Sequence, residues 1–352
     1  MKRLERFLIH TVLIGALTGL LVIVCLSFVF EFINEAGDIG KGGYTLASAM
    51  LVVALSMVQR AYEAFPMATL IGALVSLGAL AARGELVAMR AAGVSVAQIA
   101  RSVVLAGVGL AVLAAAIGEW VAPQATRMAQ VIQANAQGGQ VGLAAGGFWA
   151  RDGDLMIRAE RVVEPTLLTG VRVYAIDNVQ LTRVITAPQA RYDGAAWVLS
   201  PAEVTRISTN GVEVAQAAQI RVGGELSPAT LEVVSADAQT LAGWELARYI
   251  NYLDNNNLDS ARYQLALWVK IATPFATVVM LLLTVPLVFA SARSKGVGQQ
   301  IFLGVLIGLA FFLLNRFLGN AGLVYGLPPA LSALAPTGLF LLIALWGIRQ
   351  VR

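Results

Sequence analysis

Long apolar runs alternate along this chain with short polar ones, and six of the runs are long enough to cross a bilayer as helices. An α-helix needs about 20 apolar residues to span the hydrocarbon core. The runs that meet this requirement are Thr11–Ile33, Ala64–Ala82, Val103–Val121, Ile271–Ala290, Ile301–Leu318 and Ala330–Ile348. We therefore predict six transmembrane helices.

A seventh run, Tyr44–Val58, is apolar but short, and Arg60, Glu63 and Pro66 separate it from the run that follows. Counting it as a span would scatter the basic residues over both sides of the membrane. With six spans they all face one side, which the positive-inside rule identifies as the cytoplasm. These residues are Lys2, Arg3, Arg6, Arg83, Arg90, Arg293, Lys295, Arg349 and Arg352. We expect Tyr44–Val58 to pack at the outer leaflet without spanning.

Between residues 122 and 262 the pattern changes to alternation with period two. The stretches "VRVYAID", "LTRVIT" and "EVTRIS" alternate apolar with polar residues, and "RDGD", "YDG" and "TNG" supply turns between them. This pattern is typical of half-buried antiparallel strands. The strands follow the third span, so they lie outside the cytoplasm, in a sandwich, a jelly roll or an open barrel.

The predicted fold is therefore an α-helical membrane protein with six transmembrane helices and an extracytoplasmic all-β, jellyroll-like domain between helices three and four. Residues 1–121 hold the first three helices, 122–262 the β domain and 263–352 the last three helices. The segment "WELARYINYLDNNNLDSARYQLALW" predicts an amphipathic helix, a turn and the start of the fourth span. Because no small-residue cleavage site follows the first apolar run, we expect that run to be retained as a helix.

Composition supports an integral membrane protein. Hydrophobic residues make up 58% of the 352 residues and charged residues only 13%, whereas soluble domains carry about 25% charged residues. The net charge is +4, but the basic residues flank apolar runs instead of forming a nucleic-acid site. We expect no nucleic-acid partner.

The residues that carry chemistry are scarce. One histidine, His10, and one cysteine, Cys25, exclude a His-based triad, an HExxH helix and a zinc cluster within the chain. The sequence also lacks GxxxxGK[ST], so it has no P-loop for ATP. We expect no catalytic residue, no metal site and no cofactor in this chain, so ATP, if used, is bound by another subunit.

A polar segment, "RGELVAMRAAGVSVAQIARS" at 83–102, lies between two apolar runs on the predicted cytoplasmic side. Its helix formers predict a short helix over Gly84–Ala92, interrupted by Gly93, with Ser95 as the N-cap of the next helix. An exposed helix with Glu85 can dock a soluble partner through a charge-assisted contact. An interfacial helix with solvated charges fits the composition equally well.

The motif "GELVAMRAAG" is similar to the coupling loop of ABC permeases, which seats in a cleft of the ATPase. More specifically, "FPMATLIGALVSLGALAARGELVAMRAAGVS", "AIGEWVAPQA" and "LVYGLPP" resemble the lipopolysaccharide export permease family, LptF and LptG, over nearly the whole chain. "GEWVAPQ" and "SARYQLALWVK" favour the LptG branch. The resemblance implies a multi-pass protein of the Gram-negative inner membrane that extracts lipopolysaccharide. The partners it implies are the homologous permease LptF, a dimer of the ATPase LptB, and LptC at the periplasmic domain.

The resemblance also implies roles for individual residues. A coupling helix at about 83–97 would meet the ATPase, and its contact residues are Glu85, Ala88, Arg90, Ala91 and Gly93. A lipid with phosphates and acyl chains needs cations near the outer headgroups, and the candidates are Lys41, Arg127, Arg316 and Lys270. Aromatic residues that could line an acyl cavity are Phe28, Phe32, Phe312 and Phe317, although such residues at helical spacing are commonly plain packing. The outer end of the first helix departs from the family by being acidic.

The predicted strands could continue the lipid path, with inward residues such as Ile157 and Val173 facing a groove for acyl chains. A second reading remains open, in which the chain is a non-transporting membrane scaffold or sensor whose β domain binds periplasmic partners. A membrane enzyme is a weak third reading because no acid, base or nucleophile cluster is visible. Copurification with an ATPase would separate the first two.

Overall fold

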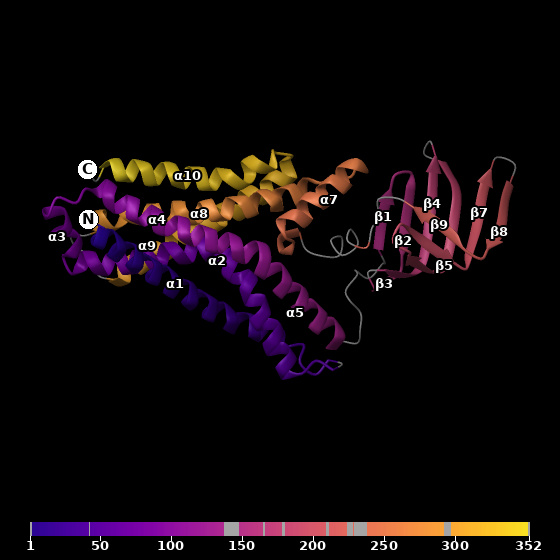
Figure 1. Ribbon diagram of the computed structural model, residues 1–352, viewed down its shortest axis with the longest axis horizontal. Helices are drawn as coiled ribbons and strands as arrows, with labels where there is room; N and C mark the ends of the chain where they lie inside the picture. Colours follow the sequence, from indigo (N-terminus) through magenta and orange to yellow (C-terminus); the bar gives the residue numbers. More distant parts are fainter. Residues whose placement is uncertain are drawn as a thin grey trace. The chain divides into compact units, whose positions relative to one another are not determined.

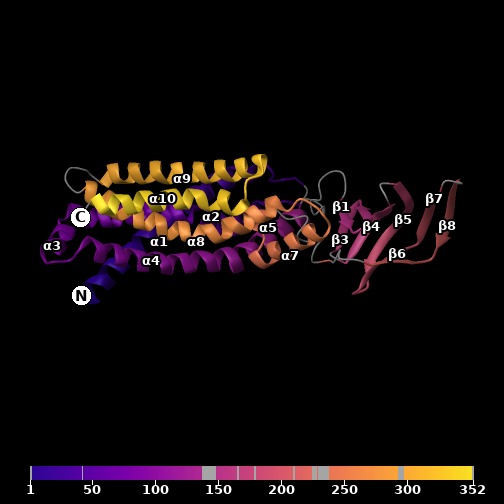
Figure 2. The ribbon, with the colours of Figure 1, turned by 90° about the horizontal axis from the view of Figure 1, so that it is seen from above.

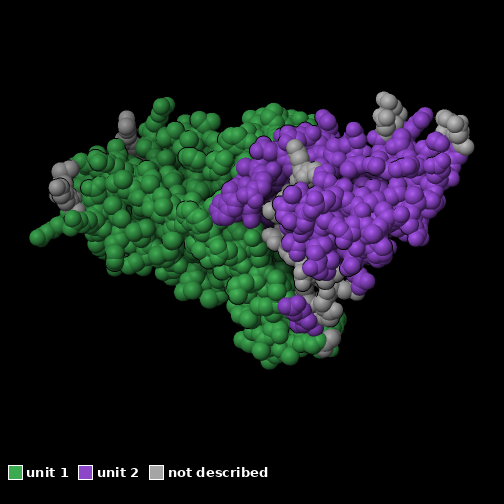
Figure 3. All heavy atoms as spheres, turned by 45° about the vertical axis from the view of Figure 1, so that its right-hand side comes forward, with its two compact units in different colours: residues 1–133, 261–352 green, residues 134–260 purple. Residues whose placement is uncertain are grey.

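The structure, a computed structural model, describes residues 2–41, 43–136, 148–164, 166–177, 180–208, 211–223, 228, 238–291 and 297–350. The chain divides into two compact units (Figures 1 and 3). Unit 1 comprises Met1–Gln133 and Ala261–Arg352, and unit 2 comprises Ala134–Ser260. The described part of unit 1 is helical, and the described strands all lie in unit 2.

Unit 1 is a bundle of long helices that run alongside one another (Figures 1 and 2). Its long helices are α1 (Lys2–Ala36), α2 (Leu46–Ala82), α4 (Val96–Ala116), α8 (Ala261–Ser291), α9 (Val297–Tyr325) and α10 (Pro329–Gln350). Within the described residues, six helical segments are long and apolar enough to cross a membrane, which confirms the predicted number. In α2 and in α8, 67% of the residues in an apolar 18-residue stretch are buried, whereas the same share is only 11% in α1 and 17% in α9. The core therefore forms around α2 and α8, and α1 and α9 present apolar side chains outward.

Helix α2 differs from the expectation. Tyr44–Val58 is not a separate segment at the outer leaflet, because Leu46–Ala82 is one continuous helix of 37 residues with Pro66 inside it. Pro66 removes one backbone donor, but a buried neighbourhood holds the helix together across it. At 1.5 Å per residue the helix is roughly 55 Å long, well beyond the ~30 Å hydrocarbon core. Its first half therefore extends beyond the hydrocarbon core on the extracytoplasmic side.

Helices α1 and α2 pack at very short range through glycines. Gly15 and Gly19 of α1, spaced as in a GxxxG motif, face Gly72 of α2. A Cβ atom built on Gly72 would lie 2.0 Å from the Gly15 carbonyl oxygen, and one on Gly19 would lie 2.7 Å from the Ala68 carbonyl oxygen. Only glycine allows the two backbones to approach this closely.

The connection between α2 and α4 has the predicted form. A short helix, α3 (Glu85–Ala91), begins after Gly84 and is followed by Gly93, and both glycines have positive φ. Ser95 caps α4: its hydroxyl accepts from the Gln98 amide, and the Gln98 side chain accepts from the Ser95 amide. This reciprocal capping box confirms the predicted N-cap.

The third span continues beyond its predicted end. Helix α4 passes into a π-helical turn, η1 (Ile117–Val121), and then into α5 (Ala122–Ala136). Residues 122–136 are thus helical, and the first strand among the described residues begins at Phe148, later than the predicted boundary of 122. The stretch "APQATRMAQVIQANA" has no alternation with period two, which is consistent with a helix.

Unit 2 contains one antiparallel sheet whose strands pair in the order β1-β2-β4-β5-β6-β9, with β3 on β4 and β7-β8 on β5. The described strands are β1 (Phe148–Asp152), β2 (Leu155–Ala159), β3 (Arg161–Glu164), β4 (Leu167–Asp177), β5 (Gln180–Tyr192), β6 (Ala196–Ser200), β7 (Ala202–Ser208), β8 (Gly211–Ala217) and β9 (Ile220–Gly223). The two longest strands, β4 and β5, form a hairpin from which the others branch.

Gly170, at φ +63°, and Pro188 lie between the Thr169–Gln189 and Val171–Ala187 pairs of the β4–β5 hairpin. On one side of these two residues the hairpin pairs with β2 and β7, and on the other side with β3 and β6. The sheet thus folds over itself as in a jelly roll. Side chains from both halves fill its interior, including Leu168, Val173, Ile185 and Leu199, and the predicted inward residue Ile157 is buried with them.

Helix α7 (Gly243–Asn255) is the predicted amphipathic helix before the fourth span, and it is followed by the predicted turn. It follows a short 3-10 turn, η2 (Ala238–Thr240). Its Tyr252 hydroxyl donates to the Arg151 carbonyl of β1, and Asn256 accepts from the Gly153 amide at 2.7 Å. These bonds tie α7 to the β1–β2 hairpin within unit 2.

Candidate functional site

Unit 1 contains a cavity of about 370 Å³ among α1, α2, α8, α9 and α10. It is a modest cavity at the lower end of the range for small-molecule sites. Its lining residues are Ser27, Arg60, Glu63, Ala64, Pro66, Met67, Val269, Ala272, Thr273, Ala276, Leu309, Phe311, Phe312, Asn315 and Thr337. The cavity therefore combines charged, polar and apolar side chains.

The polar and apolar lining residues lie at different depths. Arg60 lies about 22 residues before the end of α2 at Ala82, or roughly 33 Å along the helix. Because α3 follows Ala82 on the predicted cytoplasmic side, this distance places Arg60 at the outer edge of the ~30 Å core. Met67 on α2 and Leu309 on α9 lie deeper than Arg60 and Asn315. The cavity thus has a charged outer mouth and a more apolar inner end.

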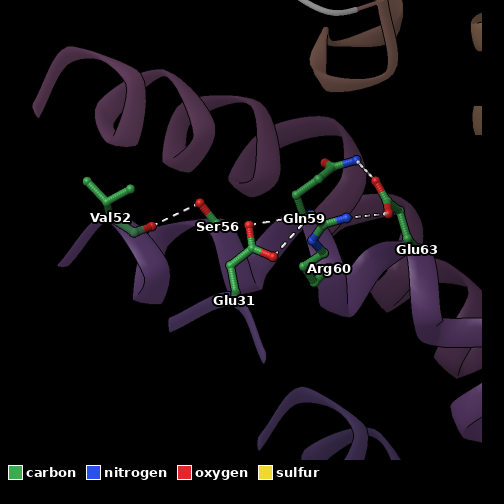
Figure 4. A network of polar contacts seen from close by, with 6 residues as sticks. All are labelled: Glu31, Val52, Ser56, Gln59, Arg60 and Glu63. Atoms are coloured by element: carbon green, nitrogen blue, oxygen red, sulfur yellow. Dashed lines mark hydrogen bonds and ion pairs between the residues drawn. The ribbon is translucent and has the colours of Figure 1, made fainter. Parts of the chain in front are cut away.

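The lining residues Arg60 and Glu63 belong to a network of polar contacts (Figure 4). The Arg60 guanidinium on α2 lies 3.3 Å from the Glu31 carboxylate on α1 and 3.8 Å from Glu63, one turn further along α2. Gln59 donates to the other oxygen of Glu63 at 2.9 Å. The guanidinium therefore lies between two carboxylates from two helices.

The electrostatics of the mouth favour an exchangeable guanidinium. The side chains of Arg60, Glu31 and Glu63 are 50%, 30% and 39% exposed, and both ion pairs are longer than an ideal contact. Exposed ion pairs of this kind contribute about 0–1 kcal/mol. A phosphate could engage Arg60 in a bidentate contact, which is stronger than the observed pairs.

The predicted cations do not line the described cavity. Lys41 pairs with Asp38 in the loop after α1, and Arg127 and Arg316 are exposed on α5 and α9. Arg316 follows the lining residue Asn315 but points elsewhere. Lys270 is not an available outer cation, because its side chain is only 10% exposed and it donates to the Gly118 carbonyl.

The aromatic candidates separate in the same way. Phe312 lines the cavity, whereas Phe317 is 67% exposed on the outward side of α9. Phe28 and Phe32 stack on each other along α1, with centroids 6.3 Å apart, and do not line the cavity. Of the four aromatic residues, the structure brings only Phe312 to the described site.

Sequence reasoning missed Arg60 and Glu63 because it read them as the break between two apolar runs. The signal was present, since charged residues within a membrane helix commonly mark a functional site. Asn315 was missed because it lies beside the more conspicuous Arg316. Arg60, Glu63 and Asn315 line the cavity, and Glu31 pairs with Arg60.

The second candidate site is the short helix α3 at the other end of unit 1. Leu86 is 2% exposed and anchors α3 to the core, while Val87, Ala88 and Ala91 face outward. The outward face thus presents one larger apolar side chain, Val87 at 61% exposure, with small residues beside it.

The charges of α3 already have partners within the chain. The Glu85 carboxylate lies 3.2 Å from the Arg83 guanidinium. The Arg90 guanidinium lies 5.8 Å from the ring centroid of Phe289 on α8, which is a cation–π contact. Gly93 ends the helix with a left-handed backbone. A partner that binds Glu85 would therefore compete with an exposed ion pair.

Among the described residues, no group of three or more His, Cys, Asp or Glu side chains is arranged to hold a metal ion. Cys25 is free and exposed on α1.

The sequence matches the family described as the lipopolysaccharide export system permease LptF/LptG over residues 6–350. The lipopolysaccharide export system permease protein LptG of Escherichia coli K12 is 36% identical over 349 residues, covering 97% of each chain. The LptG protein of Haemophilus influenzae is 32% identical over 353 residues, covering 99% of each chain.

Proposed function

The chain belongs to the lipopolysaccharide export permease LptF/LptG family, and on that premise we propose that it is the transmembrane permease subunit of an ABC transporter. In this role it extracts lipopolysaccharide from the inner membrane and passes it to a periplasmic bridge for export to the outer membrane. It is a multi-pass inner-membrane protein with a periplasmic β region, and its relatives are named as permeases rather than enzymes.

The observation that carries the proposal is the polarity gradient of the cavity. Lipopolysaccharide is an amphiphile with phosphates at the headgroup and acyl chains below it. Arg60 at the cavity mouth suits a phosphate, and Met67, Leu309 and Phe312 further in suit acyl chains. The mouth lies at the depth of the outer leaflet headgroups, where such a lipid resides.

In this proposal Arg60 exchanges partners during loading. It leaves Glu31 for a phosphate, because a bidentate charge-assisted contact is stronger than an exposed pair at 3.3 Å. The negative charges of Glu31 and Glu63 compete with the phosphate for Arg60, so phosphate binding stays reversible. Release requires only that Arg60 return to its carboxylates.

The power stroke comes from a partner, since ATP binds to a separate ATPase dimer, LptB. We place this dimer on α3, with Val87, Ala88 and Ala91 seated in its cleft. Two contacts would transmit its movement to the bundle: Leu86 in the core, and Arg90 against Phe289 of α8. Helix α8 also lines the cavity.

The remaining partners are assigned to the surfaces left over. The weakly buried helices α1 and α9 present apolar faces that suit the homologous permease LptF. LptC is proposed to meet the β region. The β interior would accept acyl chains only if the roll opens, because Ile157 and Val173 are 3% and 1% exposed in this structure.

A photocrosslinking amino acid at Phe312 tests the substrate proposal. Phe312 lines the cavity at 49% exposure, and Phe302 on the same helix is 67% exposed but lies nearer the cytoplasmic end and outside the cavity. We expect lipopolysaccharide to be captured at position 312 and not at position 302. Capture should fall when ATP drives transport through the assembled complex.

Two results would contradict the proposal. Equal capture at both positions would mean that the cavity has no preference for this lipid. Capture at position 312 that is insensitive to ATP would favour a non-transporting scaffold. Copurification of an ATPase that is lost on the substitution Ala91→Trp would support the docking site on α3.

A further inference from the structure

Lys270 is a buried charge in unit 1 that the proposed transport steps do not use. Its ammonium donates to the Gly118 carbonyl at 2.6 Å, lies 3.5 Å from the Glu119 carboxylate, and lies 5.8 Å from the ring centroid of Tyr62. The Tyr62 hydroxyl in turn donates to the Lys270 carbonyl. This junction, defined by Tyr62, Gly118, Glu119 and Lys270, is largely buried and joins α2, η1 and α8.

The junction forms at the one described π-helical turn of the chain. In η1 the Ala122 amide donates to the Ile117 carbonyl, five residues back. A π-helical turn accommodates one residue more than an α-helical turn and is unfavourable without support. Lys270 supplies that support by binding the Gly118 carbonyl, a backbone group within the turn.

Tyr62 closes the junction from the other side. A Cβ atom on Gly118 would lie 2.4 Å from the Tyr62 ring, so the turn and the ring approach each other more closely than any larger residue permits. Two residues of the motif "GEWVAP" make contacts in this junction: the glycine packs against Tyr62, and the glutamate lies near Lys270.

The extra residue in η1 sets the rotation of everything that follows in α5. One residue of α-helix corresponds to about 100° of rotation. If η1 became α-helical, α5 would turn by that amount, and Ile132 would move to the place of Gln133. In the structure Gln133 donates to Glu35 of α1 at 3.1 Å, and the Tyr44 hydroxyl donates to the same carboxylate oxygen.

We propose that Lys270 is a positioning residue that maintains the π-helical turn Ile117–Val121 and thereby sets which face of α5 meets α1. The same junction supports the cavity. Glu63 and Ala64 follow Tyr62, and Val269 precedes Lys270, so the walls of the cavity continue directly from the junction. This role of Lys270 does not depend on which lipid the cavity binds.

Cysteine cross-linking in membranes tests this proposal on the full chain. Cys25 is the single cysteine, so Cys25→Ser gives a clean background. Glu35→Cys is combined either with Gln133→Cys or with Ile132→Cys, and a short bis-maleimide is applied. With Lys270 present we expect the position 133 pair to cross-link and the position 132 pair to react weakly.

Lys270→Met should reverse this preference, because a rotation of about 100° brings position 132 to Glu35. Lys270→Arg should keep the original preference, as should the exposed-cation control Arg316→Met. Deleting Glu119 removes the extra residue of the turn. In the Lys270→Met chain this deletion should restore cross-linking at position 133, a rescue that general destabilisation does not explain.

An unchanged preference in Lys270→Met would overturn the proposal. So would failure of the Glu119 deletion to restore the preference for position 133. If Lys270→Met alone does not accumulate in the membrane, the proposal requires the Glu119 deletion to restore accumulation, and continued loss of the protein overturns it.

Discussion

Two basic residues of unit 1, at similar depth near the outer edge of the hydrocarbon core, have opposite surroundings. Arg60 is 50% exposed and contacts side-chain carboxylates at 3.3 and 3.8 Å. Lys270 is 10% exposed and donates to a backbone carbonyl at 2.6 Å. The first has partners that water or a ligand can replace, whereas the second satisfies a carbonyl of the buried residue Gly118.

The comparison shows that the position of a charge along a membrane helix does not define its role. Exposure and the nature of the partner decide between recognition and support. An exposed pair contributes about 0–1 kcal/mol and is free to exchange. A buried donor that satisfies a buried acceptor leaves a penalty of about 1–3 kcal/mol when it is removed.

The largest effect is expected from a substitution that separates α1 from α2. Such a substitution breaks the Arg60 network, which joins these two helices, and leaves the Lys270 junction in place. Gly72→Ala would put a Cβ atom 2.0 Å from the Gly15 carbonyl oxygen. We expect the free energy of unfolding to fall by about 3 kcal/mol, which thermal unfolding in detergent measures. Gly109→Ala on α4 has nothing within 4 Å and is the matched control. A loss in the control equal to that of Gly72→Ala would refute the close-packing argument.

Substituting each basic residue by methionine should affect stability to different extents. Lys270→Met should lower the free energy of unfolding by about 1–3 kcal/mol, since the Gly118 carbonyl loses its donor. Arg60→Met should lower it by less than about 1 kcal/mol, because its ion pairs are exposed. Denaturant titrations of both variants check this order. Equal losses would mean that exposure does not distinguish the two sites.

Arg60→Gln should instead affect substrate. A lost charge-assisted contact to phosphate corresponds to about 1.5–3 kcal/mol, or at least a tenfold weaker apparent affinity. Lipid-stimulated ATPase activity of the assembled complex measures this, with basal activity as the internal reference. Arg316→Gln is the control on α9. A larger effect at Arg316 would return headgroup recognition to the position first predicted from sequence.

A smaller effect is expected at α3, where both charges are exposed. Glu85→Gln removes the pair with Arg83, which contributes at most about 1 kcal/mol. If Glu85 binds the ATPase, its substitution should weaken ATPase copurification without lowering the amount of protein in the membrane. Unchanged copurification in both Glu85→Gln and Ala91→Trp would exclude α3 as the docking site.

The smallest effect is expected in the β unit, at an exposed carboxylate. Asp193 accepts from the Ala196 and Ala195 amides and pairs with Arg221, and these contacts lower the pKa of its carboxyl below the ordinary value. Because the pKa of Asp193 is lower in the folded chain, its carboxylate stabilises the fold at pH values above its pKa in the unfolded chain. This stabilisation is lost as the pH falls through its pKa in the folded chain. Protection of the Ala196 amide from exchange, measured relative to the intrinsic exchange rate at the same pH, should therefore fall below about pH 4, and Asp193→Asn should remove this dependence. Protection that stays constant through this pH range in the unsubstituted chain would contradict the assignment.

The sequence alone determined the features that depend on local pattern. Six apolar runs of sufficient length gave six membrane-length helices, and alternation with period two placed strands between the third and fourth helices. Ser95 was identifiable as an N-cap because the capping box is formed within four residues. In each case the interaction that decides the structure lies within a few residues of the pattern that reports it.

Contacts between distant segments required the tertiary structure. Arg60 interrupts an apolar pattern, yet α2 continues through it as one helix, and the partner of its guanidinium on α1 is Glu31, 29 residues earlier. Lys270 was expected among the outer cations, but Gly118, 152 residues earlier, is its acceptor. Residues 122–136 were assigned to the β domain and are helical. Hydrophobic length and period are properties of one segment, whereas the cost of a buried charge depends on which other segments fold against it.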